Sequence, residues 1–340
     1  GTTANDDWID FDLYLPAQAQ YAAVPLMVYG HGIVAFRQTA LLVAGGLAQR
    51  GIATIAIDQP LHGSRGDVNV EGSSILNIQK SQYMPRLVGM AAQSPLDFHS
   101  LLAAARDSLS HFDAFAYPNG TELIAAATGD RALLDMNKVF FTGTSMGGIF
   151  GTSFIATAPV QASYFHVSGG GIGQAFTHTI FFDNFLHFDK MFDGPAADMM
   201  VADGLLHHAI DSADGLNFLH DLHAPFGELA QRPLFIQYGI KDEVVVPQVS
   251  WAAIDTLDLP QVGAALAPMP WMVATQAGFG DGWGFTQINT PLGDFGSSGA
   301  LGSIGDLLTH LTFIEPPGNA VYFAWVDHLI TPQVPVMAAD

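Results

Sequence analysis

The sequence predicts an α/β domain with a mostly parallel central sheet and helices on both faces. Short runs that are apolar at nearly every position recur along the chain, and most are followed by a turn and a segment with helical spacing. Strands buried on both faces have this composition, because helices cover such a sheet from both sides. Hydrophobic residues make up 49% of the 340 residues, which supplies a large core. No apolar run reaches the roughly 18 residues that a membrane-spanning helix needs.

The expected elements follow one another in a regular order. Trp8–Pro16 alternates polar and apolar residues, which predicts an antiparallel edge strand or half of a hairpin. Segments 35–51, 94–112 and 146–159 have the apolar spacing of helices, and the first ends at a glycine. The runs expected to form the other strands are Val24–Gly30, Ile52–Asp58, Lys138–Gly143, Ala162–Gly169, Pro233–Gly239 and Ala320–Val326.

Three long segments interrupt this alternation. Residues 64–93 are polar with little periodicity and are expected to form a flap, and residues 274–306 are rich in glycine. Residues 173–225 are rich in Phe, Met, His and Asp, which predicts a largely helical cap, or lid, inserted between two strands. The predicted organisation is one catalytic domain formed by residues 1–172 and 226–340, with 173–225 as an insertion.

The charge and cysteine content exclude several classes of protein. The chain has 11 Lys+Arg against 32 Asp+Glu, a formal net charge of −21. Binding to nucleic acid is not expected, because phosphate recognition needs clustered cations. The absence of cysteine excludes disulfides, thiolate metal sites and a cysteine nucleophile. The acidic surface is typical of a salt-adapted or extracellular protein, and we expect a secreted or cell-surface location. The oligomeric state stays open.

The segment from Gly143 to Gly147, GTSMG, matches the pattern G-x-S-x-G. The match is weak alone in a chain with 36 glycines, but its position strengthens it. It follows the apolar run KVFF and precedes a helix-like segment, the strand–turn–helix setting of a nucleophile elbow. We therefore expect Ser145 to be a nucleophile, with Gly143 and Gly147 permitting the strained turn and Gly148 permitting close helix packing.

A serine nucleophile needs a base, usually a histidine that an acid orients. In the order typical of nucleophile elbows, the acid and then the histidine follow later strands. Asp242 follows the expected strand Pro233–Gly239, and His328 follows the last strongly apolar run, Ala320–Val326. The predicted triad is Ser145, Asp242 and His328. The alternatives for the acid are Glu243, Asp255, Asp258, Asp281, Asp294 and Asp306.

Two backbone N–H groups are expected to bind the oxyanion. One belongs to Met146, the residue after the nucleophile, and the other is expected after an earlier strand. There the chain contains YGHGI, which places the N–H of Ile33 at the required position, with Gly32 allowing the backbone to turn. We expect His31 to brace this loop and His62 to hold a neighbouring loop, neither of them transferring protons.

These motifs together resemble the α/β-hydrolase superfamily. The segment HGIVAFRQTALLVAGGLAQRGIATIAIDQPLHGSR, with GTSMGG, is similar to bacterial extracellular lipases and lipase-like lipoproteins. The likeness covers Val24 to Gly148, and the cap and glycine-rich region lie outside it. It implies the α/β-hydrolase fold, no cofactor, and a carboxylic-ester substrate, from small esters to lipids or polyesters.

The function predicted from the sequence is that of a serine carboxylesterase or lipase. A serine peptidase with the same fold and a polyester depolymerase are the alternatives within enzymes. The non-enzyme alternative is an extracellular binding module on a hydrolase scaffold, and the complete set of expected catalytic residues argues against it.

No metal site is expected. The cap contains histidines and aspartates, which could bind zinc, and Asp281 lies in a glycine-rich turn, which could bind calcium. No spacing resembles a zinc-binding motif, and a plain turn explains Asp281. The aromatic residues of the cap are expected to form its own core, with some lining the acyl pocket. The cap histidines are His178, His187, His207, His208, His220 and His223.

Overall fold

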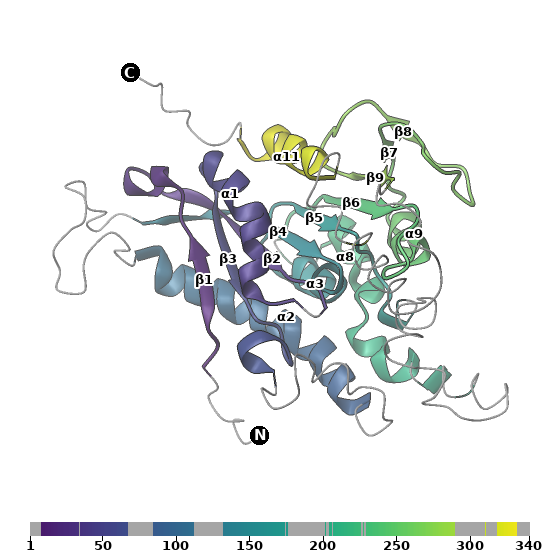
Figure 1. The fold of residues 1–340 in the computed structure, drawn as a ribbon, viewed down its shortest axis with the longest axis horizontal. Helices are drawn as coiled ribbons and strands as arrows, with labels where there is room; N and C mark the ends of the chain where they lie inside the picture. The colour runs from purple at the N-terminus through teal and green to yellow at the C-terminus, as the bar shows by residue number, and fades with distance from the viewer. Residues whose placement is uncertain are drawn as a thin grey trace, which may run out of the picture.

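The structure is a computed structural model, and it describes residues 8–33, 35–66, 84–111, 132–173, 175, 201, 204–205, 207–225, 227, 229–289, 310 and 318–331. Within these residues, nine strands form one sheet in the order β1-β3-β2-β4-β5-β6-β9-β7-β8 (Figure 1). The strands are β1 Phe11–Tyr14, β2 Val24–Gly30, β3 Ala53–Ile57, β4 Leu134–Thr144, β5 Ser163–His166, β6 Leu234–Gly239, β7 Gln261–Val262, β8 Thr275–Gln276 and β9 Gly284–Ile288.

All strand pairs but one are parallel. β1 runs antiparallel to β3, with Phe11 opposite Ile57, as expected for an edge strand with alternating residues. β2, β4, β5, β6 and β9 pair in parallel, and Thr144 of β4 lies opposite His166 of β5, which lies opposite Gln237 of β6. The carboxyl ends of β4, β5 and β6 therefore meet at one edge of the sheet.

Helices cover both faces of the sheet. α1 Leu41–Gln49 and α11 Gly318–Leu329 pack on one face, where their side chains contact Met27, Phe140 and Tyr164. α2 Met84–Asp107, α3 Met146–Thr157 and α9 Pro247–Thr256 pack on the other face. The shorter helices are η1 Ala17–Gln20, η2 Arg37–Ala40, η3 Gly63–Arg65, η6 Leu109–His111, η7 Asp211–Ala213, η8 Gly215–Phe218 and α8 His220–His223.

This architecture confirms the predicted α/β-hydrolase fold class. A mostly parallel sheet with an antiparallel edge strand carries helices on both faces, and a turn of one residue joins the central strand β4 to α3. The predicted strands from Val24 to Gly239 match β2 to β6 closely. Among the described residues, no helix is both long and apolar enough to cross a membrane.

The carboxyl-terminal part of the chain differs from the prediction. Ala320–Val326 was expected to be a strand but belongs to the helix α11. Its buried side chains include Tyr322, Trp325 and Val326, which have the i, i+3, i+4 spacing of a helix face. A strand that the sequence did not predict, β9, instead pairs with β6. β9 contains Thr286 and Gln287, so it lacks the continuous apolar run of the other strands.

The three segments expected to interrupt the alternation are only partly described. Residues 84–93 of the expected flap belong to the helix α2, which begins at Met84. Residues 67–83 lie outside the described residues, as do most of the expected cap residues, including His178, His187 and the phenylalanines between positions 176 and 192. The described part of the cap segment lies between β5 and β6 in the chain and includes η7, η8 and α8.

Candidate active site

Ser145 lies on the turn between β4 and α3, with φ of 53° and ψ of −125°. A positive φ at a residue other than glycine costs on the order of 1–3 kcal/mol, so the surroundings must hold it. The Ser145 N–H donates to the His166 carbonyl of β5 at 2.9 Å. The Ser168 hydroxyl donates to the Ser145 carbonyl at 2.7 Å. Hydrogen bonds on both sides of the residue therefore keep its main chain in this conformation.

Glycines surround the turn because the backbones approach too closely for side chains. A Cβ at Gly143 would lie 2.5 Å from the Gly148 Cα, and one at Gly147 would lie 2.2 Å from the Gly30 carbonyl oxygen. A Cβ at Gly148 would lie 2.3 Å from the Ser168 hydroxyl. Glycine is therefore required at all three positions. Without side chains there, the start of α3 can pack against the carboxyl end of β2.

The loop after β2 passes directly beside Ser145. A Cβ built on Gly32 would lie 3.2 Å from the Ser145 Cβ and 3.7 Å from its Oγ. Ile33 follows and packs against an apolar cluster that includes Met146. Met146 is the first residue of α3, so its N–H has no acceptor within the helix. The two residues expected to supply oxyanion N–H groups thus flank Ser145 and border one cluster.

His31 and Gln59 clamp this loop to the loop after β3. The Gln59 N–H donates to His31 Nε2 at 2.9 Å, so Nδ1 carries the proton and donates to the Gly32 carbonyl at 2.8 Å. The Gln59 side-chain amide donates to the His31 carbonyl at 2.6 Å. Burial lowers the pKa of His31 to about 4, which keeps the ring neutral. Both ring nitrogens of His31 are therefore bonded to main-chain groups of these loops.

A second histidine lies against this clamp. His62 is buried, its ring centroid is 5.1 Å from that of His31, and its Nδ1 donates to the Pro60 carbonyl at 2.9 Å. Burial and the neighbouring His31 lower the pKa of His62 to about 3. Both rings are therefore neutral at pH 7, and each is bonded to a main-chain group.

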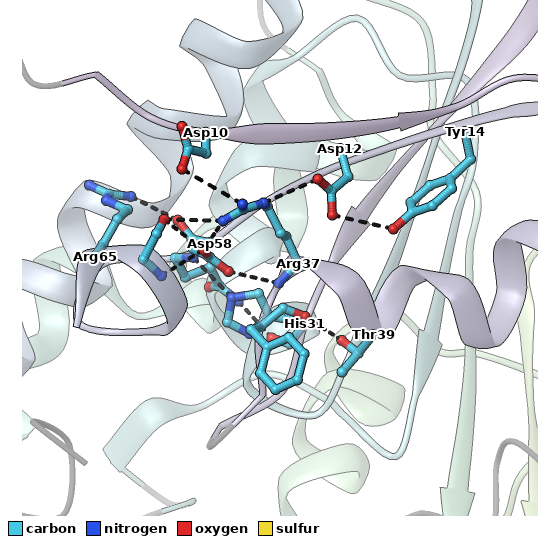
Figure 2. Close-up of polar contacts among 11 residues, drawn as sticks. Asp10, Asp12, Tyr14, His31, Arg37, Thr39, Asp58 and Arg65 are labelled. Carbon is cyan, nitrogen blue, oxygen red and sulfur yellow. Dashed lines mark hydrogen bonds and ion pairs between the residues drawn. The ribbon is translucent and has the colours of Figure 1, made fainter. Parts of the chain in front are cut away.

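An ionic network fixes the same two loops to the sheet edge (Figure 2). Asp58, at the end of β3, accepts hydrogen bonds from the Arg37 N–H at 2.7 Å, from the Arg37 guanidinium, and from the Ser64 N–H and hydroxyl at 2.9 Å. Arg37 also contacts Asp10 and Asp12 of the first strand region, at 3.6 and 3.2 Å. Burial alone raises the pKa of Asp58, but these hydrogen bonds and the Arg37 charge lower it overall.

Asp242 and His310 form a buried pair beyond the carboxyl end of β6. Asp242 Oδ1 accepts the N–H groups of Val244 at 2.9 Å and Val245 at 3.0 Å. Asp242 Oδ2 lies 2.7 Å from His310 Nδ1. His310 is 3% exposed, and its Nε2 is buried with no hydrogen-bond partner among the described residues. The carboxylate thus orients the ring and leaves Nε2 as the uncommitted nitrogen.

The predicted pairing of Asp242 with His328 is wrong. His328 lies on the exposed side of α11, where its Nε2 contacts the Gly280 carbonyl at 2.8 Å. The error follows from the strand assignment, because the apolar run before His328 is a helix. His310 is the first histidine after β9 in the chain. Recognising β9 as a strand is the signal that would have selected His310.

The two halves of the site meet at one sheet edge. Val244 and Val245, whose N–H groups bind Asp242, belong to the same apolar cluster as Met146, the residue after Ser145. The Ser168 carbonyl accepts the Ser250 hydroxyl of α9 at 2.7 Å, while the Ser168 hydroxyl binds Ser145. The segment after β5 therefore links the elbow to the segment that carries Asp242.

The histidines of the cap segment do not form a metal centre in the part of the chain that the structure describes. There, no group of three or more His, Asp or Glu side chains gathers to hold an ion. His223 stacks on Trp283 with ring centroids 4.0 Å apart, and its Nε2 contacts the Leu257 carbonyl. Asp281 lies in the turn between Gly280 and Gly282.

Comparison with known proteins gives only distant similarities. No family model and no curated protein matches the chain. Among solved structures, it is similar to an acylaminoacyl peptidase from Pyrococcus horikoshii, at 12% identity and a TM-score of 0.46, covering 96% of this chain and 40% of that protein. It is also similar to a 2,6-dihydroxy-pseudo-oxynicotine hydrolase, at 12% identity and a TM-score of 0.49, covering 95% and 65%.

A third similar structure is a cold-adapted esterase from an Arctic intertidal metagenomic library, at 14% identity and a TM-score of 0.39. The alignment covers 73% of this chain and 74% of the esterase. The chain spans about 40% of the length of the acylaminoacyl peptidase.

Proposed function

We propose that this protein is a serine hydrolase that cleaves carboxylic esters through an acyl-enzyme intermediate, with Ser145, His310 and Asp242 as its triad. The observation that carries the proposal is the buried Asp242–His310 pair, which lies at the sheet edge where Ser145 is held with a positive φ. The chain order Ser145, Asp242, His310 is the one typical of a nucleophile elbow followed by its acid and base.

The first half of the reaction forms the acyl-enzyme. Ser145 Oγ attacks the ester carbonyl while His310 Nε2 takes the hydroxyl proton. The carbonyl oxygen becomes an oxyanion, bound by the N–H groups of Ile33 and Met146, and the positive end of the α3 dipole favours the same charge. The intermediate then collapses, the bond to the alcohol oxygen breaks, and His310 returns the proton to that oxygen.

The second half releases the acid. A water molecule gives a proton to His310 Nε2 and attacks the acyl carbonyl, and a second oxyanion forms in the same place. Its collapse breaks the bond to Ser145 Oγ, which recovers the proton. Asp242 supports both halves, because its contact with Nδ1 keeps the proton on that nitrogen and stabilises the imidazolium.

The surroundings of the two N–H donors favour an ester with an aliphatic acyl group. Ile33 packs against an apolar cluster that contains Met146, Met90, Ile149 and Val244. An alkyl chain is expected to bind against such a surface. The strongly acidic composition also favours neutral esters over acidic peptides.

Turnover of matched substrates tests this proposal. We expect hydrolysis of nitrophenyl acyl esters, measured from acetyl to palmitoyl, and little hydrolysis of peptide nitroanilides. Ser145→Ala is expected to abolish ester turnover, whereas Ser153→Ala, in the helix α3 that follows Ser145, is the matched control and is expected to retain it. Turnover of the anilides alone would make the protein a peptidase, and full activity in Ser145→Ala would exclude the mechanism.

A further inference from the structure

A hollow lies at the amino ends of β4, β5 and β6, at the opposite end of these strands from Ser145. It has a volume of about 550 Å³, within the range of small-molecule sites. Its walls come from the end of α2, the start of β4, the chain after α3 and the segment before β6. Its lining residues include two arginines, Arg106 and Arg232, and three apolar residues, Met136, Val160 and Leu229.

Arg232 is a buried cation whose hydrogen-bond partners are main-chain carbonyls. The residue is 2% exposed. One terminal nitrogen donates to the Asp221 carbonyl at 2.7 Å and the other to the Ala158 carbonyl at 3.5 Å. Its Nε is buried without a partner. Since a guanidinium has five N–H donors, these two contacts leave most of its donor capacity unused among the described residues.

An anion could use the N–H donors of Arg232 that are free among the described residues. Buried charges in proteins are normally paired, because an isolated ion in a low-dielectric interior is costly. No ion pair within 4.0 Å joins Arg232 to a carboxylate in the described part of the chain, although acidic residues outnumber basic ones by 32 to 11. Burial lowers the pKa of Arg232, with the Asp221 charge acting in the opposite direction.

Arg106 brings a second cation to the same hollow. It lies in the last turn of α2, and within the described residues it forms no ion pair either. Met136, Val160 and Leu229 provide apolar walls beside the two guanidinium groups. Two arginines without a carboxylate partner among the described residues, together with an apolar wall, suit a molecule with an anionic head and a short hydrocarbon body.

We propose that this hollow binds a small organic acid, whose carboxylate is held by Arg232 and Arg106 and whose hydrocarbon part lies against Met136, Val160 and Leu229. The planar guanidinium group of an arginine can donate two parallel hydrogen bonds to the two oxygens of a carboxylate. The site lies away from Ser145 and does not depend on the esterase activity proposed above, so either proposal can fail without the other.

Isothermal titration calorimetry with hexanoate, hexanol and inorganic phosphate tests the site. We expect saturable binding of hexanoate, weaker binding of phosphate, and no binding of hexanol. Arg106→Gln is expected to weaken hexanoate binding about tenfold or more, because a charged hydrogen-bond partner is lost. Arg232→Met is expected to weaken it further. Arg106 is exposed, so its variant keeps the test valid even if Arg232→Met does not fold.

Arg50→Gln is the matched control, because it removes the same charge from a residue that pairs with Asp327 outside the hollow. It is expected to bind hexanoate like the unmodified protein. Absence of saturable hexanoate binding, or equal weakening by Arg106→Gln and Arg50→Gln, would overturn the proposal. Phosphate binding as tight as hexanoate binding would overturn the assignment of an organic acid.

Discussion

The two sides of the candidate active site are held in different ways. On the oxyanion side, the loops after β2 and β3 are joined by the His31–Gln59 clamp and by the Arg37–Asp58 network, with several hydrogen bonds in each. On the acid–base side, the His310 ring forms one hydrogen bond among the described residues, from Nδ1 to Asp242 at 2.7 Å.

This difference indicates where the site tolerates change. Loss of one bond on the oxyanion side leaves other bonds that still position the loop. Loss of Asp242 or His310 leaves nothing in the described structure that replaces it. Substitutions on the acid–base side should therefore reduce turnover much more than substitutions on the oxyanion side.

The largest effect is expected from His310→Asn. Removing the base eliminates proton transfer from Ser145, and loss of a triad histidine reduces turnover by about ten-thousandfold or more. Steady-state hydrolysis of a nitrophenyl ester measures the effect, and thermal unfolding checks that the variant is folded. A folded His310→Asn enzyme that retains a tenth of the activity would remove His310 from the mechanism.

Asp242→Asn is expected to reduce kcat by about a thousandfold to ten-thousandfold. An amide in place of the carboxylate favours the wrong histidine tautomer and no longer stabilises the imidazolium. Asp255→Asn, on α9, is the matched control and should leave kcat unchanged. Similar losses in both variants would show that the effect does not come from the contact with His310.

Gln59→Met removes the side-chain hydrogen bond from Gln59 to the His31 carbonyl, one of the bonds of the oxyanion-side clamp, without removing a catalytic group. We expect kcat to fall by about tenfold to a hundredfold with little change in KM, since the loop would position the Ile33 N–H less well in the transition state. Gln49→Met, at an exposed position of α1, is the control. A change in KM alone would contradict a role in positioning the oxyanion donor.

The buried neutral histidines of the same region predict a loss of stability in acid. The pKa is lowered to about 4 for His31 and to about 3 for His62, whereas an unfolded histidine titrates near 6.5. The unfolded state therefore binds more protons as pH falls below about 6.5, and the free energy of unfolding should decrease by about 2 kcal/mol per histidine between pH 7 and pH 5.

Urea unfolding at the two pH values measures this decrease. His31→Gln should show a smaller decrease than the unmodified protein, because the variant has no proton to bind at that position. His220→Gln is the control, since the His220 side chain is 80% exposed. Equal pH dependence in all three proteins would mean that His31 is not held neutral by burial.

The smallest effect is expected from His328→Asn. This side chain contacts the Gly280 carbonyl at the surface, and exposed substitutions of this kind change stability by about 0.5 kcal/mol or less. We expect ester turnover to change by less than about twofold. A large loss of turnover in a folded variant would restore the assignment made from the sequence alone.

The central half of the fold was predictable because its signals are local. Apolar runs such as Val24–Gly30 form buried parallel strands, and the glycines around Ser145 have the spacing that close backbone contact requires. The loop after β2 was predictable for the same reason, since Gly32 and Ile33 follow their strand directly.

The carboxyl-terminal part was not predictable from local patterns. β9 carries polar residues such as Gln287, whose side chain is buried because it binds Tyr238 and the Ala267 carbonyl. Its strand character therefore depends on pairing with β6, which is a tertiary contact. A short apolar run of aromatic residues fits a strand or a buried helix equally well, and α11 is the helix. The choice of His328 rather than His310 as the base depended on whether this run is a strand or a helix.

The most direct test of the proposed triad is reaction with a fluorophosphonate, followed by mass spectrometric mapping of the labelled peptide. We expect rapid labelling of Ser145 in the unmodified protein and in His328→Asn, and labelling slowed by about a thousandfold or more in His310→Asn. Labelling of another residue, or fast labelling of Ser145 in a folded His310→Asn protein, would contradict the assignment of Ser145 and His310 as one catalytic unit.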